Sequence, residues 1–298
     1  MWRDDTAHNR RIGIALVALA MALFSTVDAS AKWLVQTLPV FEVVWLRLLA
    51  HVVISSALLA PTYGYELVRV GDWRLHLLRA LMFAVMTALN IWALQYLQLA
   101  TVGSIMFSTP ILIALLSAWW LRERIDARRW VAICAGFGGV LLVVGPGTQA
   151  FHPAVLVICI NAAIYAAFNL LTRRMAATES PAAVQLLSAA GATVLIAPFA
   201  LMNWEWPGSW QQWILVAVCG FSGGMGHYIF AKAHRHATAA TLGPFLYQQM
   251  LYMAIWGWLL FGHVPDIFIV CGAAIVVASG LYLFWLQARS DDVLCGSA

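Results

Sequence analysis

The chain has 298 residues, of which 63% are hydrophobic and only 10% are charged, and its formal net charge is +4. An ordinary soluble domain carries about 25% charged residues, so a soluble fold of this length could not bury so much apolar surface behind a charged exterior. The composition therefore predicts a protein dissolved in lipid, without a separate soluble domain. It argues against a nucleic-acid-binding protein, a cytosolic enzyme or a disulfide-rich secreted module. The five cysteines form no CxxC or Cys/His metal spacing, so we expect neither a metal site nor a disulfide framework.

Apolar stretches follow one another along the whole chain, each about long enough for a helix that crosses a bilayer core of about 30 Å. We expect ten such helices, at residues 12–34, 40–60, 75–95, 100–121, 130–146, 153–172, 182–202, 212–232, 239–261 and 267–287. Most connections between them have only a few residues, which favours helix hairpins. The predicted fold class is therefore an all-α integral membrane protein with ten transmembrane helices.

The first stretch has features of a signal peptide. Arg10-Arg11 precede an apolar run, and Ala29-Ser30-Ala31 could serve as a cleavage site. Nine further apolar segments follow, and removal of the first would leave an odd number of helices. We therefore expect this stretch to remain as the first transmembrane helix.

The positions of Lys and Arg predict the orientation in the membrane. With the N-terminus in the cytoplasm, fifteen of the 17 Lys and Arg residues fall at cytoplasmic ends, and only Lys32 and Arg47 fall on the outer side. We therefore expect both termini to be cytoplasmic. The predicted outer segment between the seventh and eighth stretches is an aromatic belt with Trp204, Trp206, Trp210 and Trp213.

The two halves of the chain, residues 1–148 and 149–298, resemble one another. A shift of 140 residues places Ala100-Thr101-Val102-Gly103 on Ala240-Thr241-Leu242-Gly243, and a shift of 141 places Phe24 on Tyr165 and Asp28 on Asn169. Because each half has five predicted helices, the second half must lie upside down relative to the first. Inverted repeats around a site near the membrane midplane are the architecture of secondary transporters.

These features resemble the drug/metabolite transporter superfamily. The resemblance rests on five plus five helices, the proline of Ser108-Thr109-Pro110, the Leu121-Arg122-Glu123 helix end, Arg47, and the small-residue segment Ala135-Gly136-Phe137-Gly138-Gly139. It is strongest toward the EamA-type ten-helix exporters, particularly the aromatic amino acid exporter branch. Gly262-His263 and Met250 depart from the pattern, which has Gly-Glu and a proline there. The resemblance implies a bacterial inner membrane protein with a central cavity, lined mainly by the first, third, fourth, sixth, eighth and ninth helices, and with the fifth and tenth as outer scaffold.

Helix rise places several large side chains near the membrane midplane, about 15–18 Å deep. They are Phe24, Met86, Pro110, Tyr165 and Tyr252. Aromatic rings and methionine suit a flat apolar substrate, although ordinary helix packing is the alternative interpretation. A kink at Pro110 would open a backbone carbonyl toward the cavity, and Pro244 is a second candidate for the same role.

Polar side chains recur on single helix faces. Asn161, Tyr165 and Asn169 form one stripe, Gln249, Tyr252 and Trp256 a second, and Met86 and Asn90 share a third face. Such groups face protein or water rather than lipid. They are candidate donors and acceptors for a zwitterionic ligand, or alternatively for hydrogen bonds between helices.

Two titratable residues inside helices are candidates for substrate or proton handling. Asp28 is the one carboxylate well inside a predicted helix, and a structural ion pair with Lys32 or Arg47 is its alternative role. His227 follows a glycine-rich segment and could bind a carboxylate or carry a proton, or pack as a neutral ring. His51 falls outside the expected cavity, so we expect a structural role for it.

The function predicted from the sequence is a secondary transporter that exports amino acids, including aromatic and large apolar ones, and related small metabolites by alternating access. Efflux of cationic drugs is the runner-up, and an intramembrane lipid-modifying enzyme is a third class that lacks a catalytic cluster. No P-loop is present, so we expect no ATP-driven pumping and no cofactor. Monomer and homodimer stay open. The predicted substrate-binding residues are Phe24, Asp28, Met86, Asn90, Phe107, Pro110, Tyr165, Asn169, His227, Gln249, Tyr252 and Trp256.

Overall fold

A computed structural model describes residues 7–121, 127–144, 152–175, 178–237 and 239–295, and in these ranges the only regular secondary structure is helical. The helices in chain order are α1 (Ala7–Leu34), α2 (Val40–Tyr63), the 3-10 helix η1 (Gly64–Val68), α3 (Trp73–Leu94), α4 (Leu99–Met106), α5 (Thr109–Leu121), α6 (Ala127–Val144), α7 (Ala154–Met175), α8 (Pro181–Met202), α9 (Trp210–Ala233), α10 (Ala239–Leu246), α11 (Gln248–Phe261) and α12 (Ile267–Cys295). Arg122 and Glu123 of the Leu121-Arg122-Glu123 helix end lie outside the described residues.

The all-helical class is confirmed. Each predicted apolar stretch is helical, but two of them are broken: 100–121 forms α4 and α5, and 239–261 forms α10 and α11. Seven described helices are long and apolar enough to cross a membrane, namely α1, α2, α3, α6, α7, α8 and α9. The count of ten crossings stays a prediction.

Local sequence signals set several helix ends. The Asp72 carboxylate caps α3 by accepting a hydrogen bond from the Arg74 N–H at 2.9 Å. Ser209 and Gln212 form a reciprocal capping box at the start of α9. Helix α11 ends at Gly262, whose φ of 66° lies in the left-handed region that favours glycine. These three helix ends are therefore determined by residues close to them in the sequence.

The break between α4 and α5 is caused by Pro110. Proline has no N–H to donate to the Met106 carbonyl four residues earlier, and the Thr109 hydroxyl donates to that carbonyl at 2.5 Å instead. The neighbouring Ile105 carbonyl accepts from the Ser108 hydroxyl at 2.6 Å. The predicted kink is therefore present, but the expected open carbonyl is wrong, because a side-chain hydroxyl occupies it.

The second break lies at Tyr247, between α10 and α11. It falls three residues after Pro244, and α11 resumes with the Met250 N–H donating to the Tyr247 carbonyl at 3.1 Å. The two breaks meet in space, because the rings of Phe107 and Tyr247 have centroids 5.3 Å apart. A shift of 140 residues relates these two rings, as it relates the matching segments around them.

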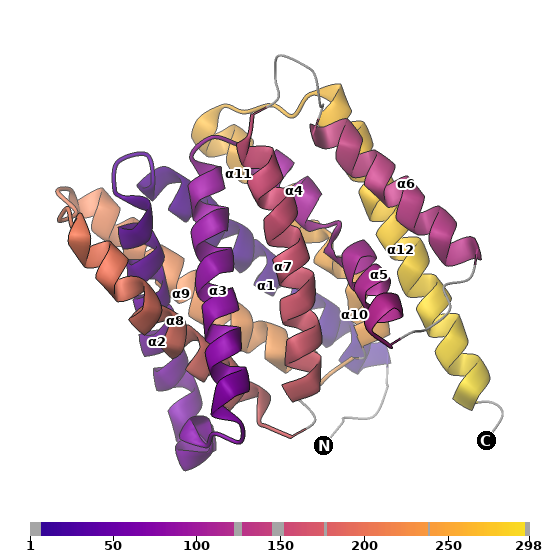
Figure 1. The fold of residues 1–298 in the computed structure, drawn as a ribbon, viewed down its shortest axis with the longest axis horizontal. Helices are drawn as coiled ribbons and strands as arrows, with labels where there is room; N and C mark the ends of the chain where they lie inside the picture. Colours follow the sequence, from indigo (N-terminus) through magenta and orange to yellow (C-terminus); the bar gives the residue numbers. More distant parts are fainter. Residues whose placement is uncertain (1–6, 122–126, 145–151, 176–177, 238, 296–298) are drawn as a thin grey trace.

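The helices pack into one bundle with a peripheral pair (Figure 1). Helix α1 packs against α9, α10 and α11, and α3 packs against α7 and α8. Helices α6 and α12 lie side by side at one edge. A Cβ at Gly272 would stand 2.6 Å from the Gly139 carbonyl oxygen, so glycine permits this close approach.

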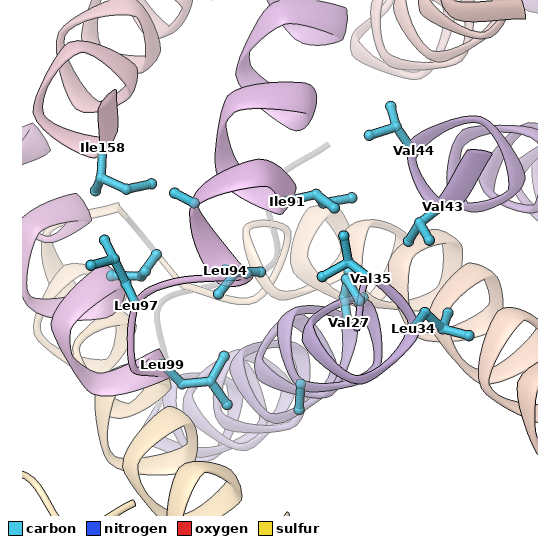
Figure 2. Packing of buried hydrophobic residues seen from close by; sticks show 14 of the residues in the cluster. Val27, Leu34, Val35, Val43, Val44, Ile91, Leu94, Leu97, Leu99 and Ile158 are labelled. Carbon is cyan, nitrogen blue, oxygen red and sulfur yellow. The ribbon is translucent and has the colours of Figure 1, made fainter. Parts of the chain in front are cut away.

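The largest buried apolar cluster joins both halves of the chain. Figure 2 shows its centre, to which four helices contribute, among them Val27 of α1, Val44 of α2, Ile91 of α3 and Ile158 of α7. A second cluster packs α1 against α9 and α10 around Met21 and Leu242. The segments that carry the candidate site residues lie between and beside these two clusters.

Candidate functional site

A carboxylate is held between three helices at the centre of the candidate site. Asp28 of α1 accepts hydrogen bonds from the Asn90 amide of α3 at 3.1 Å and from the Gln249 amide of α11 at 3.5 Å. The guanidinium of Arg47 in α2 also interacts with Asp28 electrostatically. We call these four residues the Asp28 cluster. It brings together three predicted site residues that are far apart in the sequence.

Lys32 does not form the local ion pair that was one alternative for Asp28. Its ammonium is buried and donates to the carbonyls of Leu94 at 2.7 Å and Leu97 at 2.8 Å. It also lies 5.2 Å from the ring centroid of Phe261. These carbonyls follow the end of α3, where unpaired acceptors attract a cation. That alternative is therefore wrong for Lys32, and Asp28 faces two neutral amides and Arg47.

A row of rings runs from Phe24, one helical turn before Asp28, to Phe168 of α7. Successive ring centroids lie 4.7 Å apart for Phe24 and His227, 5.0 Å for His227 and His51, 6.4 Å for His51 and Phe83, and 5.9 Å for Phe83 and Phe168. Aromatic pairs at such separations attract one another. His227, a predicted site residue, thus lies between the rings of Phe24 and His51. The ring of His51, which we expected outside the site, stands between two members of this row.

A cation lies at the other end of the ring row. The guanidinium of Arg79 in α3 stands over the Phe168 ring, 4.2 Å from its centroid. Its Nε donates to the Thr172 hydroxyl at 3.0 Å, and its Nη1 donates to the Val184 carbonyl at 2.9 Å and to the Ser188 hydroxyl. We call Arg79, Phe168, Thr172 and Ser188 the Arg79 cluster.

Two predicted residues of α7 lie next to the Arg79 cluster rather than next to Asp28. Tyr165 stacks on Phe168 with centroids 6.3 Å apart and keeps 37% of its surface exposed, so its ring is not sealed in the core. The Asn169 amide donates to the Tyr165 carbonyl at 2.7 Å. Asn169 therefore makes a local contact in this structure, and Thr172 lies one turn after it on the same face of α7.

The remaining predicted residues are spread over the helix interfaces. Met86 is buried, Phe107 meets Tyr247 at the helix breaks, and Pro110 lies just after the first break. The Tyr252 hydroxyl donates to the side-chain amide oxygen Oε1 of Gln248, in the same helix, at 3.3 Å, and Trp256 packs against the main apolar cluster. The predicted stripe on α11 thus divides, and only Gln249 reaches Asp28.

Sequence reasoning missed Arg79 and His51. Arg79 was counted with the cytoplasmic Lys and Arg residues, although it lies about two turns inside α3 and is only 6% exposed. That depth is the signal that could have separated it from Arg69 and Arg74. For His51 no sequence signal was available, since its position depends on how α2 packs against α9.

A pocket of about 550 Å³ opens between the facing ends of α2, α3 and α7. Its lining is apolar apart from Gln95, and it consists of Val40, Phe41, Ala88, Leu89, Trp92, Gln95 and Val157. None of the predicted site residues lines this pocket. Among the described residues, no group of three His, Cys, Asp or Glu side chains could hold a metal ion.

The model of the EamA-like transporter family matches residues 11–145 and again residues 152–285. The chain belongs to this family. Its two matched segments fall on the two halves that the sequence analysis compared. Family membership and the names of the relatives indicate a transporter rather than an enzyme, and an integral membrane protein.

Curated relatives of this EamA-like protein have several different substrates. It is 27% identical over 282 residues to an S-adenosylmethionine uptake transporter of Rickettsia prowazekii, covering 93% of this chain and 94% of the relative. It is 29% identical over 230 residues to a riboflavin transporter of Vibrio cholerae, covering 75% of each chain. It is 25% identical over 272 residues to the pseudopaline exporter CntI of Pseudomonas aeruginosa, covering 91% and 95%.

A solved crystal structure has the same fold, with a TM-score of 0.63 and 17% identity over 95% of this chain and 98% of the other. The relatives support the transporter family predicted from the sequence. They do not point specifically to the aromatic amino acid exporter branch.

Proposed function

We propose that this protein is a secondary transporter that exports amino acids and related small metabolites by alternating access. The observation that carries the proposal is the Asp28 cluster. A carboxylate inside a transmembrane helix is costly and marks a functional site by default. Here its partners come from both halves of the chain, Asn90 from the first and Gln249 from the second. Movement of one half against the other would therefore change the surroundings of Asp28.

The packing of the helices supports two inverted halves of five crossings each, in which α4–α5 and α10–α11 each count as one broken crossing. The contact of α1 with α9 has a counterpart in that of α7 with α3, and the contact of α2 with α9 has one in that of α8 with α3. The close contacts follow the same exchange. Ala50 lies against Gly220, and Ala80 lies against Gly191. Shifts of 140 to 141 residues relate these two pairs.

The meeting of Phe107 and Tyr247 supports the same symmetry. Residues related by a two-fold axis contact each other only where they lie close to that axis. The ring contact of 5.3 Å between the two helix breaks therefore suits an axis that passes between them. Broken helices near the midplane are a recurrent feature of transporters with inverted repeats.

The chemistry of the ring row supports a substrate with an ammonium group and a flat ring. Asp28 offers a negative charge to the ammonium group, and Phe24 and His227 offer ring faces next to it. The relatives are named for S-adenosylmethionine, riboflavin and pseudopaline. An aromatic amino acid shares with these molecules a small size and polar groups.

Efflux of cationic compounds is the second candidate, because the Asp28 carboxylate could bind a cation directly. A purely cationic substrate would need the negative charge of Asp28 and no positive partner. The transport of amino acids differs in that their carboxylate also needs a binding partner. The substrate panel below separates these two functions.

We place the protein in the bacterial inner membrane with both termini in the cytoplasm. The start of α1 and the end of α12 lie toward the same end of the bundle in Figure 1. The tryptophans of the predicted outer segment gather at one place, because Trp206 stands 5.4 Å from Trp204 and 6.3 Å from Trp213 by ring centroids. Aromatic belts mark membrane interfaces.

The test is transport by the purified full-length chain in proteoliposomes, with labelled phenylalanine, alanine and tetraphenylphosphonium as separate probes. The proposal predicts saturable exchange of phenylalanine that unlabelled amino acids compete for. Transport of tetraphenylphosphonium without phenylalanine would support cationic efflux instead. Transport of none of the probes would contradict the proposed substrate class.

A further inference from the structure

Arg79 is a buried cation without an acidic partner. It is 6% exposed, and its hydrogen bonds go to the Thr172 and Ser188 hydroxyls and the Val184 carbonyl, all of which are neutral. No carboxylate of the described residues pairs with it. Burying an unpaired charge in a membrane-spanning segment is expensive. A cation that served only to anchor the topology would instead extend away from the bundle, and Arg74, in the first turn of α3, is exposed in this way.

One edge of the Arg79 guanidinium is unused. Its Nε and Nη1 make the three hydrogen bonds, whereas Nη2 has no hydrogen-bond partner among the described residues. The side chain is fixed by the ring of Phe168 and by its bonds to α7 and α8. A fixed guanidinium with free N–H groups matches the geometry of a carboxylate.

The two helix pairs that the repeat relates, α2–α9 and α8–α3, differ in their charged residues. The shift of 141 residues that relates Asp28 to Asn169 also relates Arg47 to Ser188, and Arg79 to Gly220. Helix pairs α2–α9 and α8–α3 therefore each carry one guanidinium, Arg47 and Arg79. Arg47 interacts with the Asp28 carboxylate. The second-half counterpart of that carboxylate is the neutral amide of Asn169, one residue after Phe168 in α7, so the α8–α3 pair has the cation without a carboxylate.

We propose that Arg79 binds the carboxylate of the substrate on the cytoplasmic half of the transport path. This inference rests on the proposed function, which it narrows to substrates that carry an anionic group, such as zwitterionic amino acids. The missing anion beside Arg79 is supplied by the substrate, and the adjoining rings of Phe168 and Tyr165 receive its side chain.

Arg79 and Asp28 contact the substrate at different stages. Asn90, which holds Asp28, lies about three turns after Arg79 on α3, roughly 16 Å along the helix axis. The ammonium and carboxylate of one amino acid are too close together to reach both. The carboxylate therefore binds Arg79 when the site is open to the cytoplasm, and the ammonium group binds Asp28 when the substrate is deeper in the path.

The experiment compares phenylalanine with 2-phenylethylamine, which has the same ring and ammonium group but no carboxylate. Both are measured in proteoliposomes with the wild-type chain, Arg79→Gln and Arg79→Lys, and with Arg74→Gln as the matched control. Arg79→Gln should raise the KM for phenylalanine about ten- to a hundredfold, the worth of a charged hydrogen bond, and change that for phenylethylamine less than about twofold. Arg79→Lys should keep part of the preference for phenylalanine over phenylethylamine, and Arg74→Gln should keep all of that preference.

An equal change for both probes, or no change for either, would overturn the proposal and leave Arg79 as a structural tie. If Arg79→Gln does not reach the membrane, Asn169→Asp is the second variant. This variant leaves Arg79 in place but adds a carboxylate to α7. It should raise the KM for phenylalanine more than the KM for phenylethylamine. If the wild-type chain transports neither probe, the proposed function itself fails.

Discussion

The Asp28 cluster and the Arg79 cluster occupy the two ends of one row of rings and have opposite chemistry. Asp28 is an acid held by two amides and Arg47, whereas Arg79 is a base held by hydroxyls, a carbonyl and a ring. Under the proposed inverted repeat, the helix pairs that hold Arg47 and Arg79 correspond to each other. The difference between the clusters indicates that corresponding helix pairs of one chain can hold different charges. On the proposed path, a zwitterion would meet the Asp28 carboxylate and the Arg79 guanidinium at different depths.

Removing the acid should have the largest effect. Asp28→Asn keeps the size of the side chain and removes its charge, so transport of phenylalanine per molecule should fall at least about tenfold, because a charged hydrogen bond to the ammonium group is lost. Membrane abundance, measured by immunoblot, should stay within about twofold. Glu66→Gln, which changes an exposed carboxylate of η1, serves as the control. Unchanged transport per molecule would leave Asp28 with a structural role only.

A change in the packing of α6 against α12, the peripheral helix pair, should affect the stability of the protein but not its substrate selectivity. Gly272→Val would push side-chain atoms against the Gly139 carbonyl and so force α6 and α12 apart. We expect the abundance and thermal stability of the protein to fall, with an unchanged ratio of phenylalanine to alanine transport. Gly138→Ala is the matched control, since a Cβ there meets nothing within 4 Å. A changed substrate ratio would place this pair on the transport path.

The ring row should discriminate by substrate size. Tyr165→Ala removes contact area beside Phe168 but no charge, so transport of phenylalanine should fall by about five- to tenfold, since an aromatic pair contributes about 0.5–1.5 kcal/mol beyond its area burial. Alanine transport should change much less. Competition assays with both amino acids measure this difference. Equal losses would argue against recognition of the aromatic side chain at Tyr165.

Asp28, Asn90 and Gln249 could be singled out from the sequence because each is a polar residue within an apolar helix. Their mutual hydrogen bonds could not be predicted, because they depend on how α1, α3 and α11 pack. The partners of Lys32 could not be predicted from the sequence, because they are the backbone carbonyls of Leu94 and Leu97, which are free to accept only because α3 ends at Leu94. Pro244 predicted a kink in the second half, and the break lies three residues after it, at Tyr247.

Arg79 illustrates a different reason for a missed residue. In a transmembrane chain, positive residues near helix ends are read as topology signals, and that reading leaves no place for a cation that turns inward. Its role depends on Phe168, Val184 and Ser188, which belong to the other half of the chain. Only the packed structure reveals such contacts.

The smallest expected effect is on the pH dependence of stability, through His263, which lies near the Lys32 ammonium. Burial, together with the nearby Lys32 ammonium, lowers the pKa of His263 below its ordinary value of 6.5. The folded state thus favours neutral His263, so its stabilisation is present above pH 6.5 and is lost as the pH falls through the lower folded pKa. His263→Phe should reduce the loss of thermal stability on acidification by about 2 °C or less. Identical melting curves at each pH would contradict this assignment.

The central claim is that both clusters lie on one transport path. It is tested most directly by cysteine labelling in a variant whose native cysteines are replaced by serine or alanine, with Asn90→Cys reporting on the Asp28 cluster and Asn169→Cys on the Arg79 cluster. A membrane-impermeant maleimide is applied separately to right-side-out and inside-out vesicles, with and without phenylalanine. The account predicts labelling of both positions and protection of both by phenylalanine. The claim is contradicted if phenylalanine fails to slow labelling at Asn90→Cys, at Asn169→Cys or at both.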